Sequence, residues 1–455
     1  MNKSVQLTWL WCVCMALSAC GDEAPTPIDP PVTGYQQYGT PFSGVPAVED
    51  MVMYEVNLRG FSSGGNLQGV ISRLDALKKL GVNVIWLMPI HPIGTVNSVN
   101  SPYAVRDYKA IGAEYGTLSD LRALTDQAHA RGMAVIMDWV ANHTAWDHPW
   151  TVANKSWYTQ DAAGAITHPA GTNWMDVADL NFDNPQMRAA MIDAMRYWML
   201  EANVDGYRCD YADGVPVDFW TEALATLDTL PDRQGIWLAE GGRRDHFTAG
   251  FDMIYAWDYY DRLKRIYAGE PATSLYATHV TEYSSLPSGK HRLRYTTNHD
   301  QSAWENTPMV LFNGKAGALG ASVCAVFMEG VPLFYTGQET GRVSTLPFFS
   351  NSPVNWDENP DMQAAYAAMM AVYTRSDAAR KGTLASYADS DVVCFEKTLG
   401  TSRLLVMVNV RNTDQTLVLP AFLRNTTWTD ALTGSAVTLE TSVPLAPYQY
   451  LMLEK

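Results

Sequence analysis

Four carboxylates stand at or just beyond the ends of β-forming runs in this chain: Asp138, Asp210, Glu240 and Asp300. Alternate side chains of a strand share one face, so we expect Arg208 and Asp210 to project together. A nearby cation holds a carboxyl group ionised, which prepares it to act as a nucleophile. The same pair is also typical of a structural ion pair, so its meaning depends on whether the other acids share its site.

The elements around these residues predict a barrel. From residue 49 onward, short β-rich runs alternate with helical patterns, as in parallel strands joined by helices. Candidate helices cover 66–80, 118–131, 185–201 and 361–380. Eight candidate strands, enough to close an α/β fold of the (β/α)8 TIM-barrel type, cover 51–57, 81–89, 133–138, 204–210, 235–240, 251–255, 294–298 and 331–335.

Active sites of such barrels lie at the carboxyl ends of the strands, so all four acids are predicted to face one mouth. One acid at a strand end is usually a helix N-cap. Four acids, accompanied by Arg208, His143 and His299, are more than capping explains. The pattern therefore predicts a catalytic site built from carboxylates.

Two further segments accompany the barrel, which we expect to span residues 50–380. Residues 143–180, rich in Trp, His, Asn and Gly, are surplus to a simple βα unit and predict a B-domain excursion after the third strand. Residues 381–455 carry short alternating runs separated by turns, which predicts a C-terminal antiparallel β-sandwich domain.

The N-terminus predicts a lipoprotein. Residues 1–19 combine Lys3 with an apolar run too short to span a membrane, and small residues precede Cys20, as in a bacterial lipobox. This ending implies lipidation of Cys20 and anchoring to the bacterial cell envelope at the outer membrane; a plain secretory signal is the alternative. Residues 20–49 contain six prolines and no helical period, which predicts an extended tether. Labelled palmitate that is lost in Cys20→Ala tests the anchor.

Composition narrows the function classes. The formal net charge of -16 argues against an electrostatic nucleic-acid binder. The 15 Trp and 23 Tyr suit stacking on sugars, although such residues also fill cores. Cys209, Cys324 and Cys394 have apolar neighbours and predict buried free thiols rather than disulfides or a metal site.

Six stretches in order resemble the signature regions of the α-amylase family, glycoside hydrolase family 13. One such motif is weak evidence, whereas six in sequence are specific. The resemblance covers residues 51–339, and the tail is similar to the C domain of that family. The stretches are DWVANH at 138–143, ADLN at 178–181, GYRCD at 206–210, WLAEG at 237–241, NHD at 298–300 and GVPLFYTGQE at 330–339.

The resemblance implies that Asp210 attacks the anomeric carbon and forms a covalent glycosyl intermediate. It implies that Glu240 protonates the departing oxygen and then deprotonates water, the retaining scheme with carboxyl groups about 5 to 5.5 Å apart. This chemistry needs a raised pKa at Glu240 and an ionised Asp210 beside Arg208. Asp300 is implied to hold sugar hydroxyls, and Asp138 to support the site.

Four substrate-binding residues follow from the same resemblance: Tyr103, His143, Arg208 and His299. His143 and His299 are implied to donate hydrogen bonds to the sugar at the cleavage point. Tyr103, in SPYAVRDY at 101–108, resembles the tyrosine that stacks on that sugar, and a core aromatic is the equally open alternative.

A structural calcium ion is also implied. Asn142 and Asp179 match positions that bind Ca²⁺ in many members of the family, and the carbonyl of Gly214 is a third candidate. Hard cations prefer such oxygens, but usually 6 to 8 of them. Hydrogen bonding of these groups to loop backbone is the alternative.

The function implied is a retaining endo-type hydrolase of α-1,4 bonds in starch and maltooligosaccharides. Asp213 and Gly214 stand where many α-amylases carry a Lys-His pair on the leaving-group side. That departure leaves a maltogenic, neopullulanase-like or transglycosylating enzyme open, and a non-catalytic surface glucan-binding protein is the rival from another class. With no starch-binding domain visible in the tail, grip on granules would depend on surface aromatics or on partner glucan-binding proteins.

Overall fold

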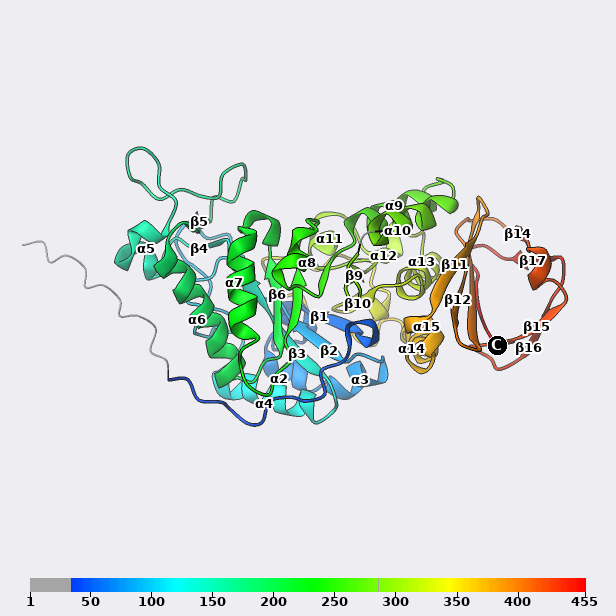
Figure 1. Cartoon of the computed structure of the whole chain (residues 1–455), viewed down its shortest axis with the longest axis horizontal. Helices are drawn as coiled ribbons and strands as arrows, with labels where there is room; N and C mark the ends of the chain where they lie inside the picture. The colour runs from blue at the N-terminus through cyan, green and yellow to red at the C-terminus, as the bar shows by residue number, and fades with distance from the viewer. Residues whose placement is uncertain (1–33, 285) are drawn as a thin grey trace, which may run out of the picture.

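The computed structural model describes residues 34–284 and 286–455. Eight parallel strands close into a barrel, and an antiparallel sheet follows at one end of the molecule (Figure 1). The predicted fold class is thereby confirmed. In the order around the barrel, the strands are β1 (Met53–Val56), β2 (Val84–Leu87), β3 (Ala134–Val140), β6 (Gly206–Asp210), β7 (Ile236–Ala239), β8 (Met253–Tyr255), β9 (His291–Arg294) and β10 (Val331–Tyr335).

Apolar side chains explain why these strands close on themselves. One set fills the interior of the barrel, including Met53, Trp86, Ile136, Leu238 and Leu333. A second and larger cluster lies between the strands and the surrounding helices. Because both faces of each strand are buried, the strands carry nearly continuous apolar runs, as parallel sheets do.

Helices cover the outside of the barrel (Figure 1). The longest, α6, begins at Pro185 after Asn184, whose side chain accepts hydrogen bonds from the backbone N–H groups of Gln186 and Met187. The helices are α1 (Leu58–Phe61), α2 (Leu67–Ile71), α3 (Leu74–Lys79), α4 (Leu118–His129), α5 (Trp150–Ala153), α6 (Pro185–Glu201), α7 (Val217–Leu227), α8 (Asp245–Ala249), α9 (Trp257–Tyr267), α10 (Thr273–Tyr283), α11 (His299–Trp304), α12 (Pro308–Leu311), α13 (Lys315–Phe327), α14 (Pro360–Arg375) and α15 (Asp377–Lys381).

One barrel strand lies earlier in the chain than the sequence predicts. The β-branched run 294–298 favoured a strand there, but β9 ends at Arg294. Arg294 is fully buried because its guanidinium pairs with Glu282 of α10 at 2.6 Å and lies over the ring of Tyr259. A paired arginine therefore takes a strand position that its charge seemed to exclude. The residues after it, up to Asn298, form the loop that leads to α11.

Two smaller regions lie at opposite ends of the barrel (Figure 1). The excursion after β3 contains the antiparallel pair β4 (His143–Ala145) and β5 (Val177–Asp179), with α5 between them. The C-terminal region is a six-stranded antiparallel sheet with a separate two-stranded sheet. Its strands are β11 (Thr383–Tyr387), β12 (Val392–Leu399), β13 (Ser402–Asn409), β14 (Gln415–Val418), β15 (Thr426–Asp430), β16 (Ala436–Leu439), β17 (Ser442–Leu445) and β18 (Tyr450–Glu454).

The segment before β1 is packed, which corrects the prediction of an extended tether for its described part. The Tyr35 hydroxyl donates to Asp193 at 2.5 Å, and Phe42 stacks on His129 with ring centroids 4.4 Å apart. Phe42, Val45 and Val48 pack against the cluster inside the barrel. The many prolines of this segment predicted an extended chain, and its few apolar residues form no periodic pattern that would have indicated packing. The predicted signal peptide at 1–19 and the lipidation of Cys20 lie outside the described residues.

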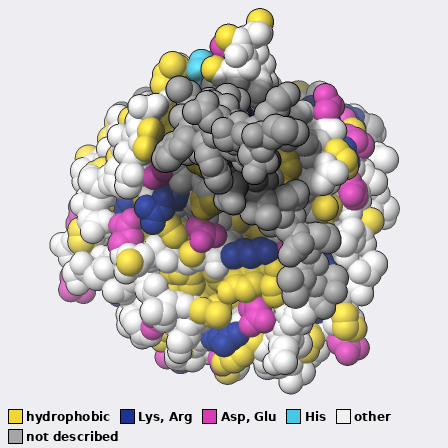
Figure 2. Space-filling view, turned by 90° about the vertical axis from the view of Figure 1, so that its left-hand side faces the viewer, with side chains coloured by type: hydrophobic (Ala, Val, Ile, Leu, Met, Phe, Trp, Pro, Cys, Tyr) yellow, Lys and Arg dark blue, Asp and Glu magenta, His cyan; other side chains and the backbone are white. Residues whose placement is uncertain are grey.

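Charged side chains of both signs lie on the surface. On the face shown in Figure 2, acidic and basic side chains are interspersed, with no broad basic patch among the coloured atoms. Cys209, Cys324 and Cys394 are buried free thiols, as predicted. Among the helices of residues 34–284 and 286–455, none combines the length and apolar character needed to cross a bilayer.

Candidate active site

Arg208 is the hub of the site. Its neighbour across the β3–β6 pair is Asp138, and both side chains project into the barrel mouth. Nη1 of Arg208 donates to Asp138 Oδ1 and to Asp210 Oδ1, each at 2.8 Å. Nη2 lies 2.9 Å from Glu240 Oε1. One fully buried guanidinium therefore contacts three carboxylates from β3, β6 and the end of β7.

Aromatic rings enclose this hub. The guanidinium carbon of Arg208 lies 5.0 Å from the ring centroid of Trp86 and 5.8 Å from those of Tyr103 and Tyr255. The Trp86 indole N–H also donates to Asp138 Oδ2 at 3.1 Å. These contacts orient Asp138 and leave it fully buried, so it supports the site from beneath rather than facing substrate.

Tyr211 fixes the other oxygen of Glu240. Its backbone N–H donates to Glu240 Oε2 at 2.7 Å. Tyr211 has a φ of 41°, a left-handed conformation that costs a bulky residue free energy. The cost is offset because this turn, directly after Asp210, points the N–H at the neighbouring strand end. The two candidate catalytic acids are thus coupled through the backbone as well as through Arg208.

A chain of hydrogen bonds holds Tyr103. His299 contacts Glu55 through Nδ1 and the Tyr103 hydroxyl through Nε2, the latter at 2.9 Å. The Tyr103 hydroxyl in turn donates to Asp138 Oδ2 at 3.0 Å. Burial lowers the pKa of His299, but the carboxylates of Asp300 and Glu55 outweigh it and raise the pKa to about 9. His299 is therefore a cation at neutral pH, and both of its ring nitrogens act as donors.

Burial dominates the electrostatics of the acids. It raises the pKa of Glu240 and of Asp210, and Arg208 opposes the shift at both groups. The sequence predicted a raised pKa at Glu240 but an ionised Asp210. The structure shows instead that Arg208 serves both carboxylates, so it does not by itself separate their ionisation. The two acids share one guanidinium, Asp210 at Nη1 and Glu240 at Nη2.

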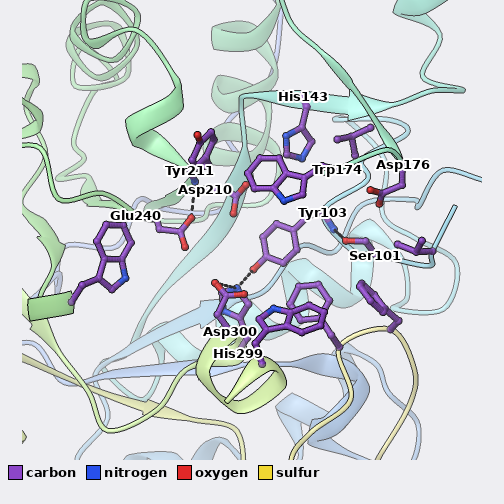
Figure 3. A pocket seen from close by; sticks show the side chains of 16 residues that line it. Ser101, Tyr103, His143, Trp174, Asp176, Asp210, Tyr211, Glu240, His299 and Asp300 are labelled. Carbon is purple, nitrogen blue, oxygen red and sulfur yellow. Dashed lines mark hydrogen bonds and ion pairs between the residues drawn. The ribbon is translucent and has the colours of Figure 1, made fainter. Parts of the chain in front are cut away.

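A cavity of about 410 Å³ opens above these groups (Figure 3). Asp210 and Glu240 lie at its floor, and Tyr103 and Asp300 face them (Figure 3). Its volume and mixed apolar and polar walls suit a small ligand or part of a chain. The lining residues are Val99, Ser101, Tyr103, His143, Trp174, Asp176, Val177, Asp210, Tyr211, Glu240, Trp257, His299, Asp300, Trp304, Phe348 and Phe349.

Most residues named from the sequence meet at this cavity. His143, at the start of β4, lines it and packs edge-on against Trp174 with ring centroids 5.6 Å apart. Burial lowers the pKa of His143 to about 4, so this imidazole is neutral where His299 is charged. Asp300 lies 3.6 Å from His299 Nε2 and is partly exposed to the cavity. Arg208 reaches the site from below and is itself covered by the acids that it holds.

Two of the three candidate calcium ligands, Asn142 and Gly214, lie side by side, and the backbone of Asp179 follows in the neighbouring β4–β5 pair. Asn142 Oδ1 lies 3.0 Å from where a Cβ on Gly214 would stand. Asp179 pairs with His143 in the β4–β5 ladder, and the Asn142 carbonyl accepts the Leu180 N–H at 3.2 Å. Amide, carboxylate and carbonyl oxygens fit a hard cation in kind, although three are fewer than Ca²⁺ usually takes. The described part of the chain holds no group of three or more His, Cys, Asp or Glu able to bind a metal.

Asp213, which departs from the family pattern, has a structural role. Its carboxylate contacts His246 Nε2 at 2.7 Å and accepts the Gly242 N–H at 3.0 Å. The Asp213 carbonyl accepts from Arg243 at 3.0 Å. Asp213 thus ties the turn after Asp210 to the loop after Glu240, and it is absent from the cavity lining.

Several residues of the site were not predicted from the sequence. Glu55 carries a signal that was available, because a lone carboxylate in an apolar strand needs a partner when buried. Tyr211, Trp174 and Trp257 gave no such signal, since an aromatic in a loop or at the end of a helix is indistinguishable from a core residue until its neighbours are known. Trp304 was hidden in the same way.

Known proteins resemble this chain in sequence and in fold. Residues 39–252 match the family model described as the α-amylase catalytic domain. Alpha-amylase MalA of Haloarcula japonica is 27% identical over 87% of this chain. The chain spans about 60% of the length of that relative. Neopullulanase 2 of Thermoactinomyces vulgaris is also 27% identical, over 86% of this chain and 71% of its own length.

Among solved structures, an α-amylase from Lactobacillus plantarum superimposes with a TM-score of 0.81. It is 28% identical in sequence, and the match covers 90% of this chain and 99% of that one. The barrel, the excursion and the C-terminal sheet therefore have a counterpart of nearly the same extent.

Proposed function

The chain belongs to the α-amylase family of glycoside hydrolases, and from that premise we propose that it is a retaining endo-type hydrolase of α-1,4-glucosidic bonds in starch and maltooligosaccharides. The observation that carries the proposal is the arrangement of Asp210 and Glu240. They end adjacent strands, contact the two terminal nitrogens of one guanidinium, and open into the same cavity. Such a pair suits the two-step displacement of a glycoside.

In the proposed mechanism, Asp210 attacks the anomeric carbon while Glu240 donates its proton to the departing glycosidic oxygen. The C–O bond to the leaving sugar breaks as the bond to Asp210 forms. Glu240, now a carboxylate, removes a proton from water, which attacks the same carbon and releases Asp210. Burial supports the first role of Glu240 by raising its pKa.

The neighbouring groups support the sugar in this scheme. Tyr103 offers a ring to its apolar face, and Asp300 accepts from its hydroxyls. His299, whose two N–H groups contact Glu55 and Tyr103, contributes its positive charge beside the sugar ring, and the neutral imidazole of His143 offers it a hydrogen-bond donor. As the bond to the sugar forms, Asp210 loses its negative charge while Glu240, having given up its proton, gains one, so Arg208 keeps one of these two anions to pair with through the step.

A second candidate is a neopullulanase-like, maltogenic or transglycosylating enzyme. It is favoured by the leaving-group side of the cavity, where Tyr211 and Trp257 present aromatic rings instead of a Lys-His pair. An aromatic surface there retains a sugar acceptor as well as a departing one. The equal identity to an α-amylase and to a neopullulanase leaves both candidates in place.

Product analysis on three substrates tests the proposal. We expect the protein to cut amylose into maltooligosaccharides of several lengths early in the reaction, with pullulan and cyclodextrin cleaved much more slowly. The Asp210→Asn variant is the control that assigns the activity to this site. Comparable rates on pullulan or cyclodextrin would favour the second candidate, and no turnover of any of the three would refute both.

A calcium ion at Asn142, Asp179 and the Gly214 carbonyl is a further part of the proposal. The ion would fasten the excursion to the barrel beside the turn that follows Asp210. Attachment to the envelope through Cys20 and association with other glucan-binding proteins stay predictions from the sequence.

A further inference from the structure

Three aromatic rings, one exposed and two half-buried, extend the cavity in a direction that none of the family motifs covers. Trp304, the last residue of α11, is 65% exposed. Phe348 and Phe349 lie in the loop between β10 and α14, and all three rings line the cavity. An aromatic ring left in water at the edge of a binding site gains free energy when a ligand covers it.

The three rings continue from Tyr103. Phe348 lies nearly parallel to Tyr103, with ring centroids 5.7 Å apart and 19° between the planes. Trp304 follows at 5.8 Å from Phe348, inclined by 36°. Phe349 stands edge-on to Phe348 at 4.9 Å. A row of aromatic rings therefore leads from Tyr103 to the solvent, and we call Trp304, Phe348 and Phe349 the aromatic platform.

Hydrogen bonds hold the loop that carries the two phenylalanines. Asn100 Nδ2 donates to the Phe349 carbonyl at 2.6 Å. Arg59 donates to the carbonyl and the side-chain oxygen of Asn100 at 2.8 and 3.1 Å, and it also pairs with Glu114 at 2.9 Å. The platform is thus fixed before any ligand arrives, so binding costs little ordering of the protein.

The platform extends from the side of the cavity that is remote from the proton donor. Glu240 lies on one side of Tyr103, and Ser101 and Asp176 lie on the other (Figure 3). Phe348, the innermost platform ring, contacts Tyr103 and His299, whereas the groups that contact Glu240 are Arg208 and Tyr211. A glycosidase donates its proton to the sugar that leaves, so the sugars on the platform are those that stay with Asp210.

We propose that the aromatic platform binds glucose units on the non-reducing side of the bond that is cut, and so sets how many units lie beyond that bond. The occupant is the α-glucan chain itself, because the platform shares one cavity with the carboxylates. Flat apolar faces of glucose stack on the rings, while Asp176 on the opposite wall can accept from hydroxyls. The inference rests on the proposed function for its substrate class.

The cleavage pattern of maltoheptaose labelled at its reducing end tests the direction. The labelled product contains the units that leave, so its length reports how the chain is placed. If Trp304→Ala removes affinity on the non-reducing side, chains will bind with fewer units there and more on the leaving side. We expect longer labelled products than wild type gives, together with a fivefold to tenfold lower kcat/KM.

Two further variants serve as controls. Trp304→Phe keeps a ring and is expected to restore most of the wild-type pattern. Phe422→Ala removes an aromatic ring of similar exposure, 62%, from the C-terminal region and should leave the pattern unchanged. Unaltered products from Trp304→Ala, or shorter labelled products, would overturn the assignment of the platform to the non-reducing side.

Binding in an inert background separates this inference from the proposed function. Calorimetry with maltoheptaose compares Asp210→Asn with Asp210→Asn/Trp304→Ala, and we expect about tenfold weaker binding in the double variant. If the double variant binds maltoheptaose more weakly but the wild-type protein cuts no α-glucan, the platform proposal stands and the proposed hydrolase activity is refuted. Equal binding in both variants, with normal wild-type hydrolysis, would refute the platform alone.

Discussion

At the scale of single residues, the site depends on one guanidinium that three carboxylates share. Arg208 satisfies Asp138, Asp210 and Glu240 at once, and it is the reason that three carboxylates can be buried together. A lysine has one point charge and no fork, so it cannot bridge the same three groups. The sequence indicated that Arg208 pairs with Asp210, because side chains two residues apart on a strand project from the same face. It did not reveal that Glu240 also contacts the guanidinium of Arg208.

The charge on His299 gives a prediction about pH. Its folded pKa of about 9 lies above the unfolded value of 6.5, so its contribution to stability is complete below pH 6.5 and is lost as the pH rises through 9. Glu55→Gln removes one of the carboxylates that raise this pKa. Because Asp300 keeps part of the shift, we expect the variant to be less stable than wild type by on the order of 1 to 2 kcal/mol at pH 6, with the gap closing toward pH 9.5.

Urea unfolding of wild type and Glu55→Gln at several pH values measures that gap. A Glu114→Gln variant, which alters a more exposed ion pair with Arg59, is the control and should give a gap that does not vary with pH in this way. Parallel stability curves for wild type and Glu55→Gln between pH 6 and pH 9.5 would contradict the assignment of the charge.

At the scale of elements, hydrophobic periodicity carried the prediction further than any other signal. It located seven of the eight barrel strands, and the predicted helix 185–201 coincides with α6. It failed at β9, where Arg292 and Arg294 occupy a buried strand because partners on other elements accept their charge. Such compensation comes from residues that are distant in the chain, so no local pattern contains it. The same limit applies to Tyr211 and Trp304, whose roles depend on what packs beside them.

The proposed calcium ion gives a prediction at this scale, because it would join β5, the end of β3 and the turn after β6. A chelator should lower the melting temperature, and added Ca²⁺ should restore it. Asp179→Asn, which removes a charged ligand, should melt lower than wild type in calcium and respond less to chelation. Scanning calorimetry in each condition is the measurement. A wild-type melt that is unchanged by the chelator would exclude a stabilising ion.

At the scale of the whole molecule, the barrel and the C-terminal sheet form a continuous structure. Arg411, just beyond β13, donates to the Glu270 carbonyl at 2.7 Å and pairs with Asp391. Tyr448 stacks on Tyr267 of α9 with ring centroids 5.8 Å apart. These contacts fasten the C-terminal region to helices α9 and α13 at the side of the barrel away from the excursion (Figure 1). The excursion lies at the other end of the barrel and contributes Trp174 and Asp176 to the wall of the cavity.

The central claim is that Asp210 and Glu240 hydrolyse an α-glucan with retention of configuration. Proton NMR of the first products released from maltoheptaose tests it most directly, with Asp210→Asn as the inactive control. If the enzyme retains configuration, we expect the new reducing ends to appear first as the α-anomer and to reach the equilibrium mixture only later. First products in the β-configuration, or turnover by Asp210→Asn close to that of wild type, would contradict it.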